Sequence, residues 1–285
     1  MNNGLLMVIM STLFLSVMVV VSTAGKEAVQ SYEFPIANSI KMEVVEGDIT
    51  ISKGDRHNIL VEFVNGLRDP RVMTTTVDTL DGVLTIKEVY SKNGPGGRTD
   101  WKITLPSTMA FDKIDCLIGS GKITLTGIRS HSINCISGDI YADALESAEL
   151  YLCASSNSLI SRDCRISSSG EFVSADARMK IDLPYLPAKS LKAACTSNKL
   201  SLKVPSFGEN FLLTLMKNSG VGKIIMPFSC MQQETLRFDK GDTYLTDRCT
   251  VKHGDGGPEV TLITGDGTIE LLTGNYLRSS IERLF

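Results

Sequence analysis

The 285-residue sequence is poor in the residue types on which most binding and catalytic chemistry depends. Only 6% of the residues are aromatic, with one tryptophan, so few rings are available to stack on sugars or nucleobases. Lysine and arginine number 29 against 32 aspartates and glutamates, a near balance that gives no electrostatic case for nucleic acid, which requires a concentrated basic face. The three histidines, His57, His131 and His253, lie in polar settings without a cysteine or carboxylate at ligand or base spacing. We therefore expect no catalytic residues, no cofactor, no metal site and no nucleic-acid partner.

Long apolar runs are absent except at the N-terminus. There, an apolar stretch from Leu5 to Val21 is followed by Ser22-Thr23-Ala24, which places small residues at the -3 and -1 positions of a cleavage site. This pattern predicts a signal peptide over residues 1–24 and a mature domain over 25–285. The alternative is an uncleaved membrane anchor, because residues 5–22 approach the length of a membrane span. Either interpretation predicts a secreted or cell-envelope protein.

A short phrase recurs along the rest of the chain: glycine, any residue, then an aliphatic residue that begins a strand. One copy has asparagine in place of glycine, and both residues adopt left-handed backbone angles at low cost. The phrase therefore predicts a repeated turn, at Gly47, Gly82, Gly121, Gly138, Gly170, Asn198, Gly222 and Gly267. A further turn at Ser156-Asn157 would lie only 13 residues before Gly170, so one of these two assignments must be wrong.

The segments beside these turns alternate apolar and polar residues with a period of two, which indicates short strands. Several strands end at a proline, such as Pro106, Pro184 and Pro205, which marks a corner because proline cannot extend a central ladder. Turns 17 and 24 residues apart indicate coils of roughly 20 residues, and the intervals of 35 and 39 residues around Gly82 indicate two coils each.

These features predict a right-handed parallel β-solenoid, a stack of coils in which each strand pairs with its equivalents above and below. The ends of the stack need covers, which we assign to the segment through Phe34-Pro35-Ile36 and to a C-terminal helical cap around residues 275–285. The alternative is an antiparallel β-sandwich in which the same turns form hairpins.

The seven cysteines contain no Cys-x-x-Cys pair, which argues against a zinc site. Cys116 and Cys135 lie 19 residues apart, about one coil, and both alternate with an inward isoleucine. We expect their side chains to stack in adjacent coils, either as a disulfide or as small buried hydrophobic residues. Cys230 and Cys249, also 19 residues apart, could close a second disulfide.

Three phrases give the chain a resemblance to a known family: Trp101-Lys-Ile-Thr-Leu-Pro106, Ile-Gly-Ser-Gly-Lys-Ile-Thr-Leu at 118–125, and Ile-Ser-Gly-Asp-Ile at 136–140. They resemble the putative adhesin family of exported proteins, and the segment Val260 to Leu271 is similar to its terminal repeat. The resemblance covers roughly residues 40 to 272. It implies a right-handed parallel β-solenoid without an established enzymatic activity, and no functional residues can be carried over from it.

Two functions remain open from the sequence. The first is a non-catalytic exported scaffold or adhesion module that binds an unknown protein or polysaccharide at the cell surface. The second is a glycan-active β-helix enzyme, a lyase or a hydrolase, which would need carboxylates gathered in a cleft.

Overall fold

The structure, a computed structural model, describes residues 20–22, 29–65, 73–90, 98–218, 222–227, 232–237 and 245–273. All regular elements in these ranges are strands, and they join into one mostly parallel sheet. The strands are β1 (Val20–Ser22), β2 (Val29–Phe34), β3 (Ser39–Gly54), β4 (Ile59–Asn65), β5 (Met73–Leu80), β6 (Val83–Tyr90), β7 (Thr99–Pro106), β8 (Phe111–Thr126), β9 (Arg129–Ser137), β10 (Asp139–Asp143), β11 (Glu146–Ala154), β12 (Ser158–Arg162), β13 (Arg165–Ser174), β14 (Arg178–Asp182), β15 (Ser190–Cys195), β16 (Lys199–Lys203), β17 (Phe211–Lys217), β18 (Ile224–Ile225), β19 (Gln232–Arg237), β20 (Leu245–His253), β21 (Glu259–Thr264) and β22 (Thr268–Leu272).

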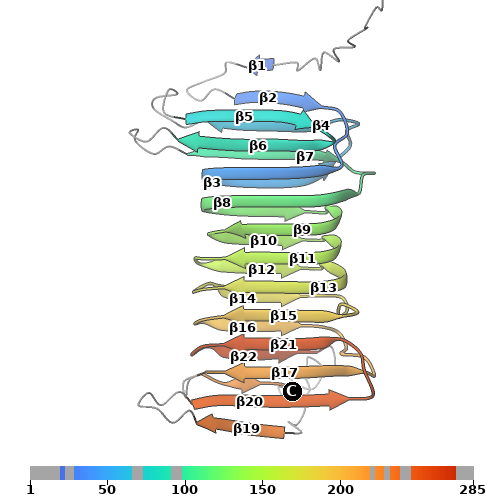
Figure 1. Cartoon of the computed structure of the whole chain (residues 1–285), viewed down its shortest axis with the longest axis vertical. Helices are drawn as coiled ribbons and strands as arrows, with labels where there is room; N and C mark the ends of the chain where they lie inside the picture. The colour runs from blue at the N-terminus through green and yellow to red at the C-terminus, as the bar shows by residue number, and fades with distance from the viewer. Residues whose placement is uncertain are drawn as a thin grey trace, which may run out of the picture.

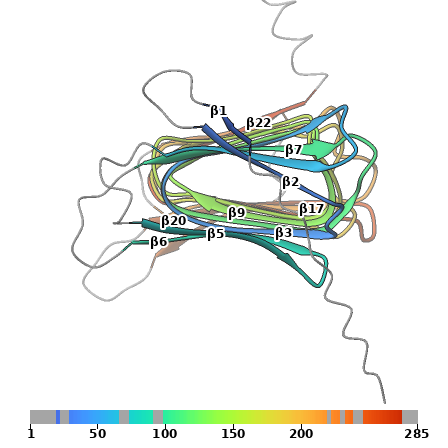
Figure 2. The same cartoon turned by 90° about the horizontal axis from the view of Figure 1, so that it is seen from above.

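The centre of the molecule is a stack of rungs, each made of two strands that meet at a corner (Figure 1). Strands β9, β11, β13 and β15 pair in parallel and form a first face, while β10, β12, β14 and β16 pair in parallel and form a second face. Viewed along the stack, successive rungs superimpose around a flattened outline (Figure 2). Every backbone in this region thereby gains hydrogen-bonding neighbours on both sides.

The interior is filled by columns of aliphatic side chains that point inward from successive rungs. Ile123, Ile140 and Leu159 occupy equivalent positions on β8, β10 and β12, and none of them is exposed. The alternation of buried and exposed residues along each strand follows the period of two seen in the sequence. Burial of these columns against one another supplies the hydrophobic core.

The antiparallel sandwich is wrong as a description of this chain, because the central strand pairs are parallel. Antiparallel pairs occur at the two ends, where β1, β2, β4 and β5 join the N-terminal rungs and β19 and β20 join the C-terminal rungs. Buried Phe34 at the end of β2 belongs to the N-terminal cover, as expected. The expected helical cap at 275–285 lies outside the described residues. So does most of the expected signal peptide, of which Val20–Ser22 forms β1 against β2.

The order of rungs in space departs from the order in the sequence at both ends. Strand β3 pairs with β6 and β7 on one side and with β8 on the other. The later rung β6–β7 therefore lies beyond β3, and the two-coil interpretation of the intervals around Gly82 is wrong. At the other end, the rung β21–β22 lies between β15–β16 and β17–β18, although it comes last in the chain.

Six of the predicted turn residues lie at one corner of the stack, where the first face meets the second: Gly47, Gly121, Gly138, Asn198, Gly222 and Gly267. Gly121 shows why glycine is needed there, since a Cβ on it would lie 1.6 Å from the carbonyl oxygen of Gly47 in the adjacent rung. The requirement is thus a close approach of neighbouring backbones as well as a positive φ, which at Gly121 is 139°.

Two predicted turns differ from this pattern. Gly82 follows Asp81 in the two-residue hairpin loop between β5 and β6, with φ values of 75° and 51°. Gly170 is not a turn: unlike Gly47 and Gly121 it does not have a positive φ, and it lies within the first face, where it pairs with Leu150 and Leu191. The corner of that region is formed by Ser156-Asn157, between β11 and β12. Gly170 instead leaves room in the core for the side chains of its neighbours.

Cys116 and Cys135 lie opposite each other on β8 and β9, both buried, and both are free thiols. The disulfide is not formed because in-register Cβ atoms on parallel strands lie about 4.8 Å apart, beyond the usual Cβ separation in a disulfide. Contact with the Cys116 thiol, together with burial, raises the pKa of Cys135 well above its usual value. Cys249 is disulfide-bonded, whereas Cys230 lies outside the described residues.

Candidate functional site

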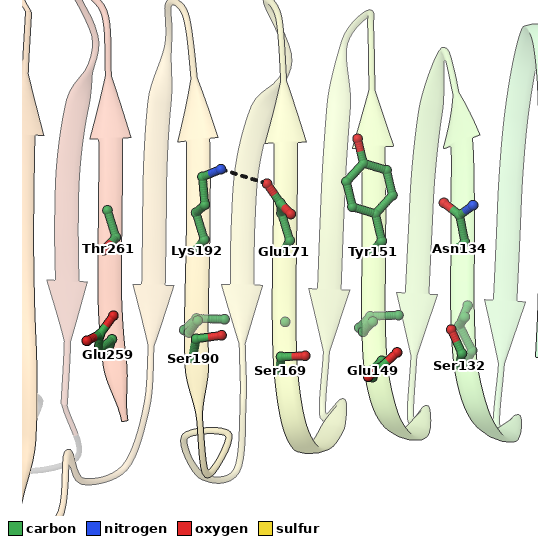
Figure 3. Close-up of a pocket in the computed structure, with 14 residues that line it drawn as sticks. Ser132, Asn134, Glu149, Tyr151, Ser169, Glu171, Ser190, Lys192, Glu259 and Thr261 are labelled. Atoms are coloured by element: carbon green, nitrogen blue, oxygen red, sulfur yellow. Dashed lines mark hydrogen bonds and ion pairs between the residues drawn. The ribbon is translucent and has the colours of Figure 1, made fainter. Parts of the chain in front are cut away.

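A polar groove crosses the first face of the stack, with a volume of about 410 Å³. It crosses β9, β11, β13, β15 and β21, so it spans four strand spacings, or ~19 Å. Its outward side chains form two rows across the strands (Figure 3). One row is Ser132, Glu149, Ser169, Ser190 and Glu259, and the other is Asn134, Tyr151, Glu171, Lys192 and Thr261.

The rows exist because the rungs are in register. Glu149 pairs with Ser132 on one side and with Ser169 on the other, and the pairing continues from Ser169 through Ser190 to Glu259. Strand β13 carries one extra residue opposite Ala148, where the register shifts between β11 and β13. Such a bulge bends its strand and changes the direction of nearby side chains. Here it lies at the edge of the groove.

Three carboxylates and one ammonium group line the groove, so its charge is negative at neutral pH. The Lys192 Nζ lies 2.9 Å from Glu171 Oε1, in an ion pair whose partners both remain about half exposed. Among the described residues, neither Glu149 nor Glu259 shares an ion pair. These two carboxylates therefore remain available to accept hydrogen bonds from a ligand.

Tyr151 is the one aromatic residue that lines the groove. Burial, together with the neighbouring Cys153, raises the pKa of the Tyr151 hydroxyl. The group therefore stays protonated at neutral pH and can donate a hydrogen bond as well as accept one. With the serine hydroxyls and the Asn134 amide, it makes the groove a line of hydrogen-bonding groups.

The groove residues include no histidine and no cysteine. They therefore contain neither a cysteine nucleophile nor a histidine that could act as its base. His131 lines a separate hollow, in which Arg129 and Arg165 both bind Glu146. No cluster of three or more candidate metal ligands occurs in the part of the chain that the structure describes. Within the same ranges, no helix is long and apolar enough to cross a membrane.

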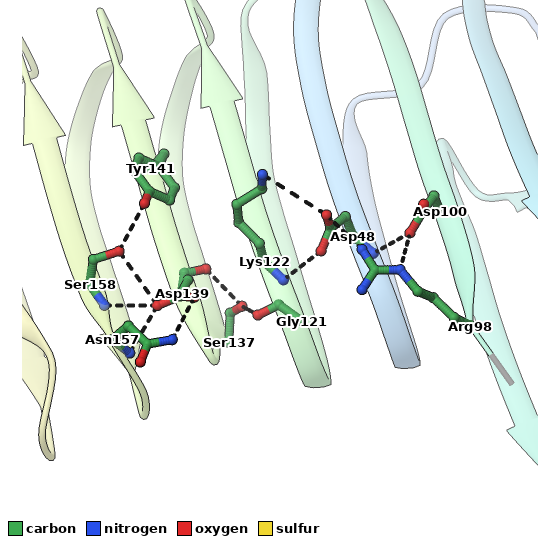
Figure 4. A network of polar contacts seen from close by, with 10 residues as sticks. All are labelled: Asp48, Arg98, Asp100, Gly121, Lys122, Ser137, Asp139, Tyr141, Asn157 and Ser158. Atoms are coloured by element: carbon green, nitrogen blue, oxygen red, sulfur yellow. Dashed lines mark hydrogen bonds and ion pairs between the residues drawn. The ribbon is translucent and has the colours of Figure 1, made fainter. Parts of the chain in front are cut away.

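A second polar cluster lies at the glycine corner and explains the Gly-Asp-Ile phrases of the sequence (Figure 4). Asp48 Oδ1 accepts a hydrogen bond from the backbone N–H of Lys122, its equivalent in the next rung, at 3.0 Å. Asp139 Oδ1 accepts from the backbone N–H groups of Asn157 and Ser158 at 2.9 and 2.7 Å. These aspartates hold adjacent rungs together, so their role is structural.

Sequence reasoning identified one groove residue, Gly170, and assigned it to a turn. Its backbone forms part of the groove floor. Apart from the buried Ile133, Leu150 and Leu191, the other lining residues are outward polar positions, and they come from strands as far apart in the sequence as those of Ser132 and Thr261. The alternation of each strand shows that they point outward, but only the register shows which of them are neighbours.

No family model matches the chain, and no curated protein is similar to it. Several solved structures are similar, at low identity. A putative adhesin from Bacteroides fragilis is 13% identical with a TM-score of 0.40, and the match covers 87% of this chain and 98% of that one. A putative cell adhesion protein from Clostridium sporogenes is 12% identical with a TM-score of 0.37, over 87% of this chain and 100% of that one. A putative lipid binding protein from Parabacteroides distasonis is 14% identical with a TM-score of 0.45, over 87% of this chain and 98% of that one. Proteins described as adhesins are thus among the structures similar to this chain, as the sequence resemblance predicted.

Proposed function

We propose that this chain is an exported, non-catalytic binding module, built as a right-handed β-solenoid, that holds a polysaccharide chain along the groove of its first face. The observation that carries the proposal is the double row of hydrogen-bonding side chains across five in-register strands. A linear polymer with a hydroxyl group at regular intervals fits a row of donors and acceptors that repeats every ~4.8 Å.

The charge of the groove narrows the class of polysaccharide. Glu149 and Glu259 would lie beside the polymer without a cationic partner, so a uronate or sulfated chain would meet like charge. A neutral chain accepts and donates hydrogen bonds there without this penalty. An amino sugar adds a charge-assisted hydrogen bond to a carboxylate, which strengthens the contact.

The test compares three oligosaccharides of equal length by titration calorimetry: a glucose oligomer, a glucosamine oligomer and a glucuronate oligomer. We expect the glucosamine oligomer to bind best and the glucuronate oligomer worst. Glu149→Gln should weaken glucosamine binding about tenfold, which corresponds to the loss of one charge-assisted hydrogen bond of about 1.5 kcal/mol.

A matched control is Asp143→Asn, which neutralises an exposed carboxylate on β10 of the second face. It should leave binding unchanged. Absence of binding by all three oligomers, or equal affinity of both variants, would refute the proposed role of the groove.

The glycan-active enzyme is the second candidate, because the groove does gather several carboxylates. Glu149 and Glu171 belong to adjacent strands, and their Cα atoms are about 8 Å apart by one strand spacing and two residues' rise. Inverting glycosidases hold the carboxyl groups themselves, rather than the Cα atoms, ~6.5–9.5 Å apart, a separation that glutamate side chains on adjacent strands can reach. Release of reducing ends from the bound oligomer, abolished by Glu149→Gln, would favour this candidate over a binding module.

A further inference from the structure

An uninterrupted apolar column runs beside the polar groove on the outer surface of the first face. It is built from one outward side chain of each of seven neighbouring strands, in spatial order Leu117, Ile136, Cys153, Val173, Ala194, Ile263 and Met216. We call this column the apolar ladder. Leu117 and Ile136 are 48% and 38% exposed, and the other five are half-buried. Across six strand spacings the apolar ladder extends for ~29 Å.

The apolar ladder stands out from the columns around it. Two residues earlier on the same strands, the outward positions carry Asn134, Tyr151, Glu171, Lys192 and Thr261. On the other side, next to the glycine corner, the positions two residues later carry mostly small residues: Gly119, Gly138, Ser155, Ala175, Thr196, Gly265 and Asn218. These small residues let another surface approach the apolar ladder closely. A continuous, partly exposed apolar stripe of this kind is typical of an interaction surface.

The order of side chains along the apolar ladder is symmetric about its middle residue, Val173. Small residues, Cys153 and Ala194, flank Val173 on the two sides. Ile136 and Ile263 occupy the next positions, and two long side chains, Leu117 and Met216, occupy the two ends. The column therefore presents nearly the same profile in both directions.

Charged residues bound the apolar ladder at both ends. Glu43 pairs with Leu117 at one end, and exposed Arg248 pairs with Met216 at the other. Glu43 already binds Lys41 and Lys87, yet its side chain remains 32% exposed. Reversing one apolar ladder against another places the Lys41–Glu43–Lys87 cluster of one beside Arg248 of the other, which lies opposite Glu234 on β19.

We propose that the apolar ladder is the contact surface of a homodimer, in which a second copy of this chain packs face to face with its apolar ladder reversed. A two-fold axis requires a self-complementary patch, and a profile symmetric about Val173 meets that requirement. In this arrangement Val173 faces Val173 of the other copy, Cys153 faces Ala194, Ile136 faces Ile263 and Leu117 faces Met216. Each side chain meets one of similar size.

The dimer is weak and depends on concentration. The apolar ladder and one column on each side cover about 29 by 20 Å, or roughly 600 Å² per copy. The total of roughly 1,200 Å² is at the lower limit of specific interfaces. We therefore expect dissociation constants of roughly 1–100 µM. Because the groove adjoins the apolar ladder, dimerisation also covers the groove, and polymer binding competes with it.

The first experiment is sedimentation equilibrium of the full chain from about 1 to 200 µM, a range that spans the expected dissociation constant. Wild-type protein should shift from monomer to dimer. Val173→Glu places two like charges together at the two-fold axis and should weaken the dimer at least tenfold. Ile160→Glu is the matched control, since Ile160 is a half-buried outward residue on β12 of the second face. It should dimerise like wild type.

The second experiment uses a conservative substitution, so its result does not depend on whether the fold tolerates a charged side chain at position 173. Val173→Cys places a thiol on the axis, opposite its own copy. Facing sheets lie ~10 Å apart, too far for a disulfide, so a short bis-maleimide reagent is the probe. Cross-linked dimer should form with Val173→Cys and not with Ile160→Cys. It should not form with wild type either, because Cys153 of each copy faces Ala194 of the other copy rather than a second thiol.

Three results would overturn the proposal. The first is wild-type protein that stays monomeric at about 200 µM while Val173→Cys cross-links no better than Ile160→Cys. The second is a dimer that Val173→Glu leaves intact. The third is a monomer that sediments with phosphatidylcholine vesicles, and loses this binding with Val173→Glu, because the apolar ladder would then serve a lipid surface.

Discussion

Substitution of Gly121 by alanine tests whether close backbone approach at the corner holds the rungs together. Gly121 has a φ of 139°, and a Cβ there would lie 1.6 Å from the carbonyl oxygen of Gly47 and 2.8 Å from its carbonyl carbon. Both contacts are with backbone atoms, so no side-chain rotation relieves them. Strands β3 and β8, which pair along nearly their whole length, must separate at this point.

The expected cost combines two effects. An alanine at positive φ costs roughly 1–2 kcal/mol, and overpacking costs typically 1–3 kcal/mol. Gly121→Ala should therefore lower the free energy of unfolding by about 2–5 kcal/mol, a large part of the ~5–15 kcal/mol of a whole domain. Gly208→Ala isolates the first effect, since Gly208 has a φ of 77° but nothing within 4 Å of a Cβ. It should cost about 1–2 kcal/mol.

Urea unfolding followed by circular dichroism would measure both variants. Hydrogen exchange would show whether the loss of protection is centred on β3 and β8, as the geometry requires. If Gly121→Ala and Gly208→Ala reduce stability equally, the close approach of rungs at the corner does not limit the fold, and the reasoning fails.

Two further predictions concern buried and bridging carboxylates. Burial raises the pKa of Glu88, which accepts a 2.7 Å hydrogen bond from the Trp101 indole, above its usual 4.5. The folded state thus binds this proton more tightly than the unfolded state, so stability is lost as the pH rises from the unfolded pKa through the folded one. Urea unfolding between pH 4 and 7 should show wild type losing stability relative to Glu88→Gln, and a pH-independent difference would contradict the assignment. Asp139→Ala should lower the free energy of unfolding by about 1–2 kcal/mol, because the backbone N–H of Ser158 loses its carboxylate acceptor. The control Asp143→Ala should lower it by less than about 0.5 kcal/mol. Equal decreases in melting temperature for the two variants would argue against the bridging role of Asp139.

Much of the fold could be predicted from local pattern. The period of two assigns inward and outward residues, as for the inward Ile140 of β10, because burial on one side of a strand demands it. The recurring glycine phrase also located the corner from local pattern, because few residues other than glycine tolerate the positive φ and the close backbone approach found at Gly121. The interpretation failed at Gly170, where glycine serves packing inside a strand. A glycine looks the same in the sequence whether it allows a turn or makes room for a neighbouring side chain.

The spatial order of the rungs and the groove could not be predicted. Each rung points a similar set of aliphatic side chains inward, so the inward residues of β21 would pack equally well beside several other strands. Likewise, Glu149 and Lys192 read as ordinary surface residues until the register places both in the groove. Contacts between residues far apart in the sequence carry no local signature.

The sequence by itself determined the strand content, the inward side chains and most of the corners, because these depend on neighbours within a few residues. Only the tertiary structure decided which strands lie side by side. That choice depends on long-range pairing between rungs of nearly equivalent pattern, and it alone creates the rows of the groove and the symmetric order of the apolar ladder.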